Sequence, residues 1–405
     1  MRTVVQVFSF DIVSKVFLGI IGIVIIRYMP AGQYAGYTLA TSVVAVVAGT
    51  LASSFNTIYI VGYEHLRLKG SISSFLGLQV WCIAALVVPT VFFRGLLDGI
   101  YWFVVALVFT KCLSDFSKTA FQQQLRFLRF SLIELARSVL FALAVVVLVW
   151  VHGYHIQTWQ VLLAQAVTLL LVFLVAFSRR IEPRALLKVG ETARLAGAVV
   201  RGDYRYLLGY FFLLAVFSQM DVFMLRFLGT YKMVATYGSA LRYYSLLMLA
   251  LNAVHVVLLP LVNQVQTIPQ LDEIYRKQRK MVMLFVPLAL LAGWGAQWIM
   301  PWADQGKYPN SVAVFRILVL SAIISFSFSP HANLIMRFKD FKFQLFLIGG
   351  GLLLHAGLNL ALIPRLAETG AACATLIATG GVNLIIFLRA RKHRLSLPLT
   401  AEPPA

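Results

Sequence analysis

The feature that most constrains this sequence is a series of apolar stretches, each about as long as a lipid bilayer is thick. A helix needs roughly 20 mostly apolar residues to cross the hydrocarbon core. Such stretches recur along all 405 residues, separated by short connections rich in glycine, proline and charge. We therefore expect twelve membrane-spanning helices, at 4–28, 34–61, 72–93, 98–117, 131–151, 157–177, 206–228, 236–262, 280–300, 311–335, 342–363 and 368–388.

The basic residues support this reading, because the cytoplasmic connections of membrane proteins are enriched in Lys and Arg. Most of the 35 Lys and Arg residues fall in every second connection and at the two ends of the chain. A wrong helix count would scramble that alternation. We therefore predict an all-α polytopic membrane protein with both termini in the cytoplasm. The opposite side holds only Arg27, Arg94, Arg226, Lys232, Lys307 and Arg365.

Composition excludes several other classes of protein. Charged residues make up 12% of the chain and hydrophobic residues 60%, whereas soluble domains carry about 25% charged residues. The net charge of +20 is typical of nucleic-acid-binding proteins in a soluble chain, but here it follows from membrane orientation, so we predict no nucleic-acid partner. The three cysteines are far apart in apolar stretches, which predicts neither a disulfide framework nor a metal site. No phosphate-binding glycine motif or serine-nucleophile motif occurs, and we do not expect an enzyme.

The longest polar stretch divides the chain into two halves of six spans each. We expect an N-terminal bundle at 1–177, a basic cytoplasmic linker at 178–205, a C-terminal bundle at 206–394 and a disordered tail at 395–405. The linker either lies along the anionic inner leaflet or is a solvated connection. Both readings fit its basic sequence.

The two halves resemble each other weakly at their first hairpins. With one inserted residue, Arg27 aligns with Arg226 and Tyr37 with Tyr237. Six helices separate the copies, so both have the same orientation, which predicts two bundles related by a pseudo-twofold axis along the membrane normal. The alternative is a chance likeness between two apolar hairpins.

Three segments are similar to the multidrug/oligosaccharidyl-lipid/polysaccharide (MOP) superfamily, in particular its Wzx-type polysaccharide and O-antigen flippases. The first is the hairpin at 25–37, although Met29-Pro30 stands where the family usually has Leu-Gly. The second is the apolar run 256–261, which contains Pro260. The third and most specific is 359–378, with its Asn, Leu-Ile-Pro and Gly-Ala-Ala-x-Ala-Thr pattern. These motifs indicate the fold more than the substrate.

Charged residues inside the spans are the best functional candidates, because charge at mid-bilayer is costly. For a polyprenyl-pyrophosphate substrate, as the resemblance implies, bases at several depths would replace the water lost by the phosphates. Asp221 and Arg242 match in depth and could pair, whereas Arg316 has a comparable depth and no visible partner in the sequence. The predicted substrate-binding residues are Lys15, Lys111, Arg137, Arg242, Arg316, Tyr243 and Tyr244. The residues predicted to couple ions or to pair with these bases are Asp11, Asp115, Glu134 and Asp221.

Each candidate also has a structural reading. Asp11 and Lys15, Lys111 and Asp115, and Glu134 and Arg137 are spaced to neutralise each other on one helical face. Such pairs also hold helices together without touching a substrate. The intramembrane histidines His255, His331 and His355 are either titrating groups or packing residues.

The sequence therefore favours a flippase for a lipid-linked oligosaccharide in a bacterial inner membrane, working by alternating access. It would use no cofactor, with H⁺ or Na⁺ coupling as an option. Its partners would be the lipid-linked oligosaccharide, membrane lipids and, as a further option, a polysaccharide polymerase and other glycan-assembly proteins. Two alternatives remain: a cation-coupled multidrug exporter of the same superfamily, and a non-transporting scaffold of a glycan-assembly complex.

Overall fold

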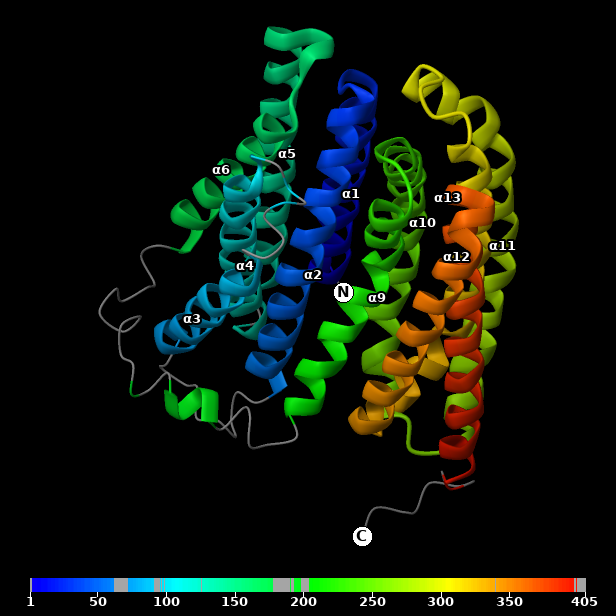
Figure 1. Cartoon of the computed structure of the whole chain (residues 1–405). Coiled ribbons are helices and arrows are strands. Elements are labelled where there is room, and N and C mark those ends of the chain that lie inside the picture. Colours follow the sequence, from blue (N-terminus) through cyan, green and yellow to red (C-terminus); the bar gives the residue numbers. More distant parts are fainter. Residues whose placement is uncertain are drawn as a thin grey trace. The chain divides into compact units, whose positions relative to one another are not determined.

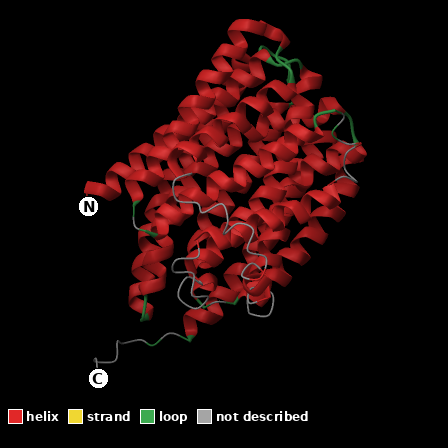
Figure 2. Ribbon diagram, turned by 90° about the vertical axis from the view of Figure 1, so that its left-hand side faces the viewer, coloured by secondary structure: helices red, strands yellow, loops and turns green. Residues whose placement is uncertain are grey.

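In the computed structural model, the described part of the chain is helical and contains no strand (Figures 1 and 2). The prediction of an all-α chain is confirmed. The structure describes residues 2–61, 72–90, 99–124, 126–177, 193–197, 204–338 and 340–396, with residues 95, 97, 190 and 398. Within these ranges only the backbone is described for 2–12, 15, 60–61, 72–74, 86–90, 122, 127, 204, 249–261, 263 and 264. Most of the expected linker and tail lies outside the described residues.

The chain divides into two compact units, unit 1 at 1–219 and unit 2 at 220–405. Seven helices in the described part are long and apolar enough to cross a membrane. The count of twelve spans and the twofold relation between the halves remain predictions. The seven spans are Ala31–Tyr59, Leu128–His155, Thr158–Phe177, Arg205–Leu228, Ile268–Asp304, Ser311–Arg337 and Phe341–Leu395.

Unit 1 is built around pairs of long helices, with α4 packing on α2 and α6, and α1 packing on α5. A cluster of buried aromatic rings fills its interior, including Tyr59, Phe75, Phe116 and Phe177, each at most 1% exposed. The ring centroids of Phe75 and Phe116 are 6.1 Å apart, and those of Phe116 and Phe177 are also 6.1 Å apart. This packing fixes α4, which carries three of the charged side chains considered below. The helices are α1 (Arg2–Tyr28), α2 (Ala31–Val61), α3 (Ile72–Thr90), α4 (Tyr101–Gln123), α5 (Phe127–His152) and α6 (Thr158–Phe177), with a short 3₁₀ turn, η2 (Gly153–His155).

Unit 2 is centred on α12, which packs against α10, α11 and α13. Helix α9 starts in unit 1 and ends in unit 2. Helix α11 begins at Ile268, well before the expected span at 280–300, because the polar residues that precede the apolar segment are helical as well. In its first turn the side chain of Gln270 accepts a hydrogen bond of 3.3 Å from the backbone N–H of Thr267, a helix-start signal. The helices are α9 (Tyr204–Leu228), α10 (Tyr231–Gln264), α11 (Ile268–Asp304), α12 (Ser311–Arg337) and α13 (Phe341–Leu395).

Helix α13 consists of two arms joined at Ala367, where the backbone is non-helical with φ 50° and ψ −134°. Its colour passes from orange to red along the two arms in Figure 1. The arms approach so closely at Gly370 that a Cβ there would collide with the carbonyl of Leu362. The two arms correspond to the two expected segments at 342–363 and 368–388.

Replacing Gly370 with Ala is therefore expected to lower the free energy of unfolding by about 1–3 kcal/mol, the usual range for overpacking. Gly350 is the matched control, since it lies in the same helix and a Cβ there would meet nothing within 4 Å. The measurement is the Tm of both purified variants in one detergent. Equal Tm values for the two variants would contradict the close approach of the arms.

An ion pair joins the two ends of α13. Asp340, just before the first arm, accepts hydrogen bonds from Arg389 Nε at 3.0 Å and Nη2 at 2.6 Å near the end of the second arm. His393 Nε2 lies 3.4 Å from the same oxygen. Partial burial favours the neutral acid, but the bonds and charges of Arg389 and His393 outweigh it and lower the pKa of Asp340 below its usual range.

This lowered pKa gives a pH prediction. The pair contributes stability above the ordinary carboxyl pKa of about 3.9, and that contribution is lost as the pH falls toward the lower pKa of the folded state. We expect the Tm of the wild-type protein to fall more steeply between about pH 5 and pH 3 than that of Asp340→Asn. Thermal unfolding of both proteins across this range measures the difference. Parallel curves would mean that Asp340 contributes nothing.

The surfaces of both units expose large apolar side chains, as contact with lipid requires. In unit 1, Trp150 on α5 is 86% exposed and Val175 on α6 is 87% exposed.

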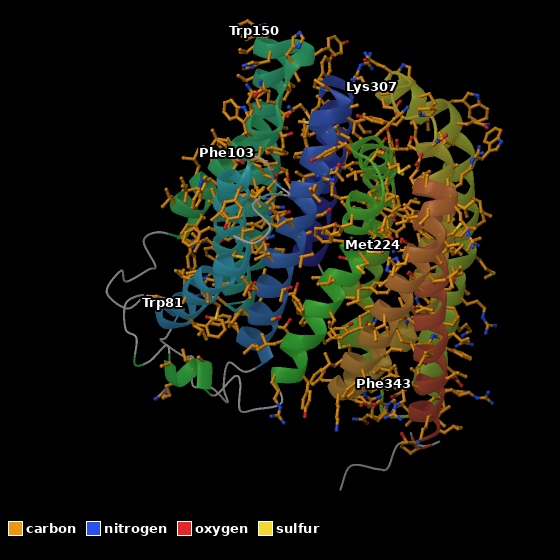
Figure 3. All side chains as sticks on the ribbon, viewed as in Figure 1. Trp81, Phe103, Trp150, Met224, Lys307 and Phe343 are labelled. Carbon is orange, nitrogen blue, oxygen red and sulfur yellow. The ribbon has the colours of Figure 1, made fainter. Side chains whose placement is uncertain are left out.

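In unit 2, Lys307 and Phe343 lie at opposite ends (Figure 3). Lys307 follows α11 and Phe343 is near the start of α13, so successive connections of unit 2 alternate between its ends.

Candidate functional site

Five charged side chains form one network between α4 and α5 in unit 1. Lys111 Nζ lies 2.7 Å from Asp115 Oδ2. Lys118 Nζ lies 3.0 Å from Asp115 Oδ1 and 2.8 Å from Glu134 Oε2. Arg137 pairs with Glu134 through Nη2, and its Nη1 lies 3.7 Å from Asp115 Oδ1. These five residues are the α4–α5 charge network.

The α4–α5 charge network carries three bases and two acids, so its formal charge is positive. Its side chains range from 9% exposed at Glu134 to 30% at Lys111. Pairing offsets much of the cost of removing these charges from water. Within the described part of the chain, Nη1 of Arg137 is buried and makes no hydrogen bond, and its nearest carboxylate oxygen is Asp115 Oδ1 at 3.7 Å.

Lys118 is the member of the network that the sequence analysis missed. It was assigned to a cytoplasmic connection because the expected span ended at 117, but α4 continues to Gln123. Its spacing of three residues from Asp115 was the available signal, since residues three and four apart lie on one helical face. The predicted pairs Lys111–Asp115 and Glu134–Arg137 are both present, and Lys118 joins them.

A second buried polar cluster surrounds Asp221 in unit 2. His355 Nε2 lies 2.7 Å from Asp221 Oδ1, and Asn359 Nδ2 donates to the same oxygen at 3.0 Å. Tyr237 donates its hydroxyl to Oδ2 at 2.5 Å, and Thr375 donates to Oδ2 as well. These five residues are the Asp221 cluster, which draws on α9, α10 and both arms of α13.

Four side chains therefore satisfy one buried carboxylate. The four described partners of Asp221 do not include Arg242, and the pairing of Asp221 with Arg242 stays a prediction. Asn359 and Thr375 belong to the segment 359–378 that carried the family resemblance, and Tyr237 is the residue that the internal repeat aligns with Tyr37. These residues were interpreted as indicators of the fold, so their shared hydrogen-bond partner, Asp221, was not predicted.

The other predicted substrate-binding residues of unit 2 occupy separate places. Arg242 and Tyr244 are half-buried on α10, and Tyr243 is buried, with its ring centroid 6.2 Å from that of Phe315. Arg316 has partners after all: its Nε donates to the carbonyl of Gly293 and its Nη2 to Gln297 Oε1, both at 3.0 Å. These partners are neutral, so among the described residues neither of them compensates the charge of Arg316.

Three further candidates are placed only in part. Asp11 and Lys15 belong to α1, and His255 to α10, but their side chains are outside the described residues. His331 stacks on Tyr275 with ring centroids 4.8 Å apart, apart from the Asp221 cluster. Within the described part of the chain, no group of three or more His, Cys, Asp or Glu side chains is arranged to hold a metal ion.

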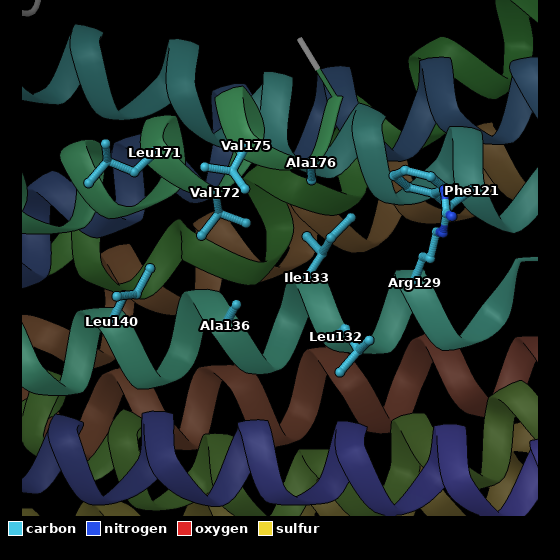
Figure 4. A pocket seen from close by; sticks show the side chains of 10 residues that line it. All are labelled: Phe121, Arg129, Leu132, Ile133, Ala136, Leu140, Leu171, Val172, Val175 and Ala176. Carbon is cyan, nitrogen blue, oxygen red and sulfur yellow. The ribbon is translucent and has the colours of Figure 1, made fainter. Parts of the chain in front are cut away.

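An apolar cavity of about 410 Å³ lies between α5 and α6 in unit 1. Arg129 and Phe121 lie at one end of it, with Leu140 and Leu171 toward the other (Figure 4). No predicted site residue lines this cavity. Its chemistry suits a hydrocarbon chain rather than a charged group.

Comparison with known proteins identifies the fold. No family model and no curated protein sequence matches the chain. Among solved structures, the chain is similar to the lipid II flippase MurJ in its inward closed conformation, with a TM-score of 0.76 and 13% identity over 96% of this chain and 89% of that one.

Two further transporters are also similar in structure. An inward-facing multidrug resistance MATE family transporter of the MOP superfamily has a TM-score of 0.74 and 12% identity, covering 95% of both chains. A eukaryotic MATE transporter has a TM-score of 0.65 and 14% identity, covering 94% of both chains. This chain therefore has the fold that MOP-type transporters and flippases share.

Proposed function

We propose that this protein is a membrane flippase that moves a polyprenyl-pyrophosphate-linked oligosaccharide from the cytoplasmic to the periplasmic leaflet of a bacterial inner membrane. Such a step supplies lipid-linked sugar for polysaccharide or O-antigen biosynthesis. The observation that carries the proposal is the α4–α5 charge network. It places three bases and two carboxylates in a largely buried position, with a net positive charge.

The pyrophosphate of the substrate explains why a net positive network is useful. Phosphate oxygens that leave water need charged donors in its place, and guanidinium groups supply them with directional bonds. Lys15, Lys111 and Arg137 would meet the pyrophosphate from the cytoplasmic side. Arg242 and Arg316 would hold or release it near the outer side, with Tyr243 and Tyr244 beside the sugars.

Alternating access would carry the head group across while the polyprenyl tail stays in the bilayer. Arg316 supports this role because Gly293 and Gln297 orient its guanidinium without neutralising it. The network in unit 1 is different, since its carboxylates hold each base in place. The substrate would thus pass from a partly neutralised group to an uncompensated one.

The test is transport by the full chain in proteoliposomes. Fluorescent undecaprenyl-pyrophosphate-linked sugar is placed in one leaflet and its appearance in the other is followed by quenching. We expect a rate well above that of empty vesicles and of vesicles with an unrelated folded membrane protein. A rate equal to both controls, with correctly folded protein, would exclude the proposal.

The Asp221 cluster favours a second candidate, a cation-coupled multidrug exporter. A buried carboxylate whose described partners include no Lys or Arg is a natural binding group for H⁺ or Na⁺. Efflux of a cationic dye by the same proteoliposomes, with no lipid transfer, would favour this candidate. Ion coupling at Asp221 is equally compatible with a flippase, and we propose it there as the energy source.

A scaffold without transport is the third reading. It predicts that Arg242→Ala and Arg316→Ala leave glycan export intact in cells. The flippase proposal predicts reduced export for both variants at unchanged protein levels in the membrane.

A further inference from the structure

A cavity of about 830 Å³ lies at one end of unit 2, where α11 begins and where α12 and the second arm of α13 end. The basic connections assign this end to the cytoplasm. None of the predicted substrate-binding residues lines the cavity, and neither does any member of the α4–α5 charge network or of the Asp221 cluster. The cavity is therefore a separate feature that the proposed transport mechanism does not use.

Four arginines and one carboxylate line this cavity. Arg394 is held by the carboxylate, since its Nε and Nη2 donate to the two oxygens of Asp272 at 3.1 and 2.9 Å. Arg276, Arg279 and Arg391 have no carboxylate within ion-pair distance in the described part of the chain. The cavity thus presents three guanidinium groups that are not held in an ion pair with a described carboxylate, and such groups fit the oxygens of a phosphate.

The lining changes character with depth along both helices. On α11 the basic residues are followed one turn further in by Val282, and on α13 Arg391 is preceded one turn further in by Phe387. The ring of His331 lies against Phe387, with centroids 5.1 Å apart. One helical turn is about 5 Å. The charged side chains of the lining therefore lie about one turn from an apolar part formed by Val282, Phe387 and the ring of His331. A molecule that fills this cavity is amphiphilic, with its anionic group at the end of the helices.

We propose that this cavity binds the head group of an anionic phospholipid from the cytoplasmic leaflet. Arg391 and Arg394 lie near the end of α13, and Arg276 and Arg279 lie in the charged turns of α11 that precede its apolar segment. Lipid phosphates lie at the border between charged and apolar turns, and the inner leaflet is the source of anionic lipid that a basic site at this depth meets. The apolar part of the lining accepts the glycerol and the first acyl carbons. The lipid would bridge α11, α12 and α13, and so stabilise unit 2.

Three lysines at the same end provide a matched control. Lys277, Lys280 and Lys392 are exposed neighbours of the cavity arginines in the sequence but do not line the cavity. Replacing all three with Ala removes the same charge as Arg276→Ala/Arg279→Ala/Arg391→Ala. A general attraction of basic residues to an anionic membrane predicts equal effects for the two triple variants. A specific binding site in the cavity predicts a larger effect for the arginine variant.

The experiment measures the Tm of the full chain in detergent during titration with phosphatidylglycerol, phosphatidylcholine or inorganic phosphate. We expect phosphatidylglycerol alone to raise the Tm. Its apparent affinity should be about 100-fold weaker in the arginine triple variant and nearly unchanged in the lysine triple variant. Equal weakening in both variants would overturn the proposal. A Tm increase with inorganic phosphate that competes with the lipid would identify a soluble anion instead.

A measurement on the wild-type protein keeps the proposal testable if the arginine triple variant does not fold. Phosphatidylglycerol with a photoreactive group near its head is cross-linked in nanodiscs, and the labelled peptides are identified by mass spectrometry. The proposal predicts labels within 272–282 and 387–394, reduced by unlabelled phosphatidylglycerol. Labels spread evenly over the basic cytoplasmic connections would contradict it.

Discussion

Arg137→Gln is expected to lower the rate of lipid transfer by about 100-fold, equivalent to roughly 2.7 kcal/mol at 1.36 kcal/mol per factor of ten. Arg137 is the only base of the α4–α5 charge network that lies on α5, and it contacts both carboxylates. Its loss cancels the net positive charge of the network and removes the guanidinium that links Glu134 to Asp115. Initial rates in proteoliposomes, at matched reconstitution and with the Tm of each variant, measure the effect.

The double variant Glu134→Gln/Arg137→Gln separates charge from architecture. It removes one acid and one base, so the network keeps its net positive charge while losing the pair between them. If the charge attracts the pyrophosphate, the double variant recovers much of the rate that the single variant loses. If both folded variants are equally slow, the network acts by positioning α4 against α5 and not by its charge. Lys277→Gln, at an exposed pair with Glu273, is the control and should keep the wild-type rate.

Asp221→Asn is expected to abolish transport driven by an imposed ion gradient and to lower the free energy of unfolding by about 3 kcal/mol, the upper range for groups bonded to a buried charge. Tyr237, Thr375 and Asn359 all donate to this carboxylate. An amide in its place offers one acceptor oxygen and brings two donors of its own, so several bonds are lost together. The measurement compares transport under a proton gradient, a sodium gradient and no gradient.

The coupling ion is the one whose gradient drives transport in the wild-type protein but not in Asp221→Asn. Glu273→Gln is the control, because it neutralises an exposed carboxylate of the same unit. An Asp221→Asn protein that folds and still responds to both gradients would show that the Asp221 cluster only holds α9, α10 and α13 together.

The sequence predicts the helices well because the bilayer imposes one length scale on them. Connections were predicted less well wherever a helix continues past its apolar segment. Lys118 lies in such an extension of α4, and Arg276 and Arg279 in another at the start of α11. Hydropathy ends a span at the first charges, whereas backbone hydrogen bonding continues the helix. Lys118 of the α4–α5 charge network and the arginines of the unit 2 cavity were therefore assigned to connections.

The candidate site was predictable only where it depends on local spacing. Lys111–Asp115 and Glu134–Arg137 follow from positions on one helical face. The Asp221 cluster does not, because His355 and Thr375 are far from Asp221 in the sequence and meet it only through tertiary packing. Matching depths suggested Arg242 as the partner, but depth leaves the rotation of each helix undetermined.

The central claim is that buried positive charge receives the pyrophosphate of a lipid-linked sugar. The most direct measurement compares transfer rates, in the same proteoliposomes, for three polyprenyl-linked sugars that carry a pyrophosphate, a monophosphate or no phosphate between lipid and sugar. We predict the fastest transfer for the pyrophosphate, slower transfer for the monophosphate and a background rate for the neutral lipid. Equal rates for all three would contradict the claim.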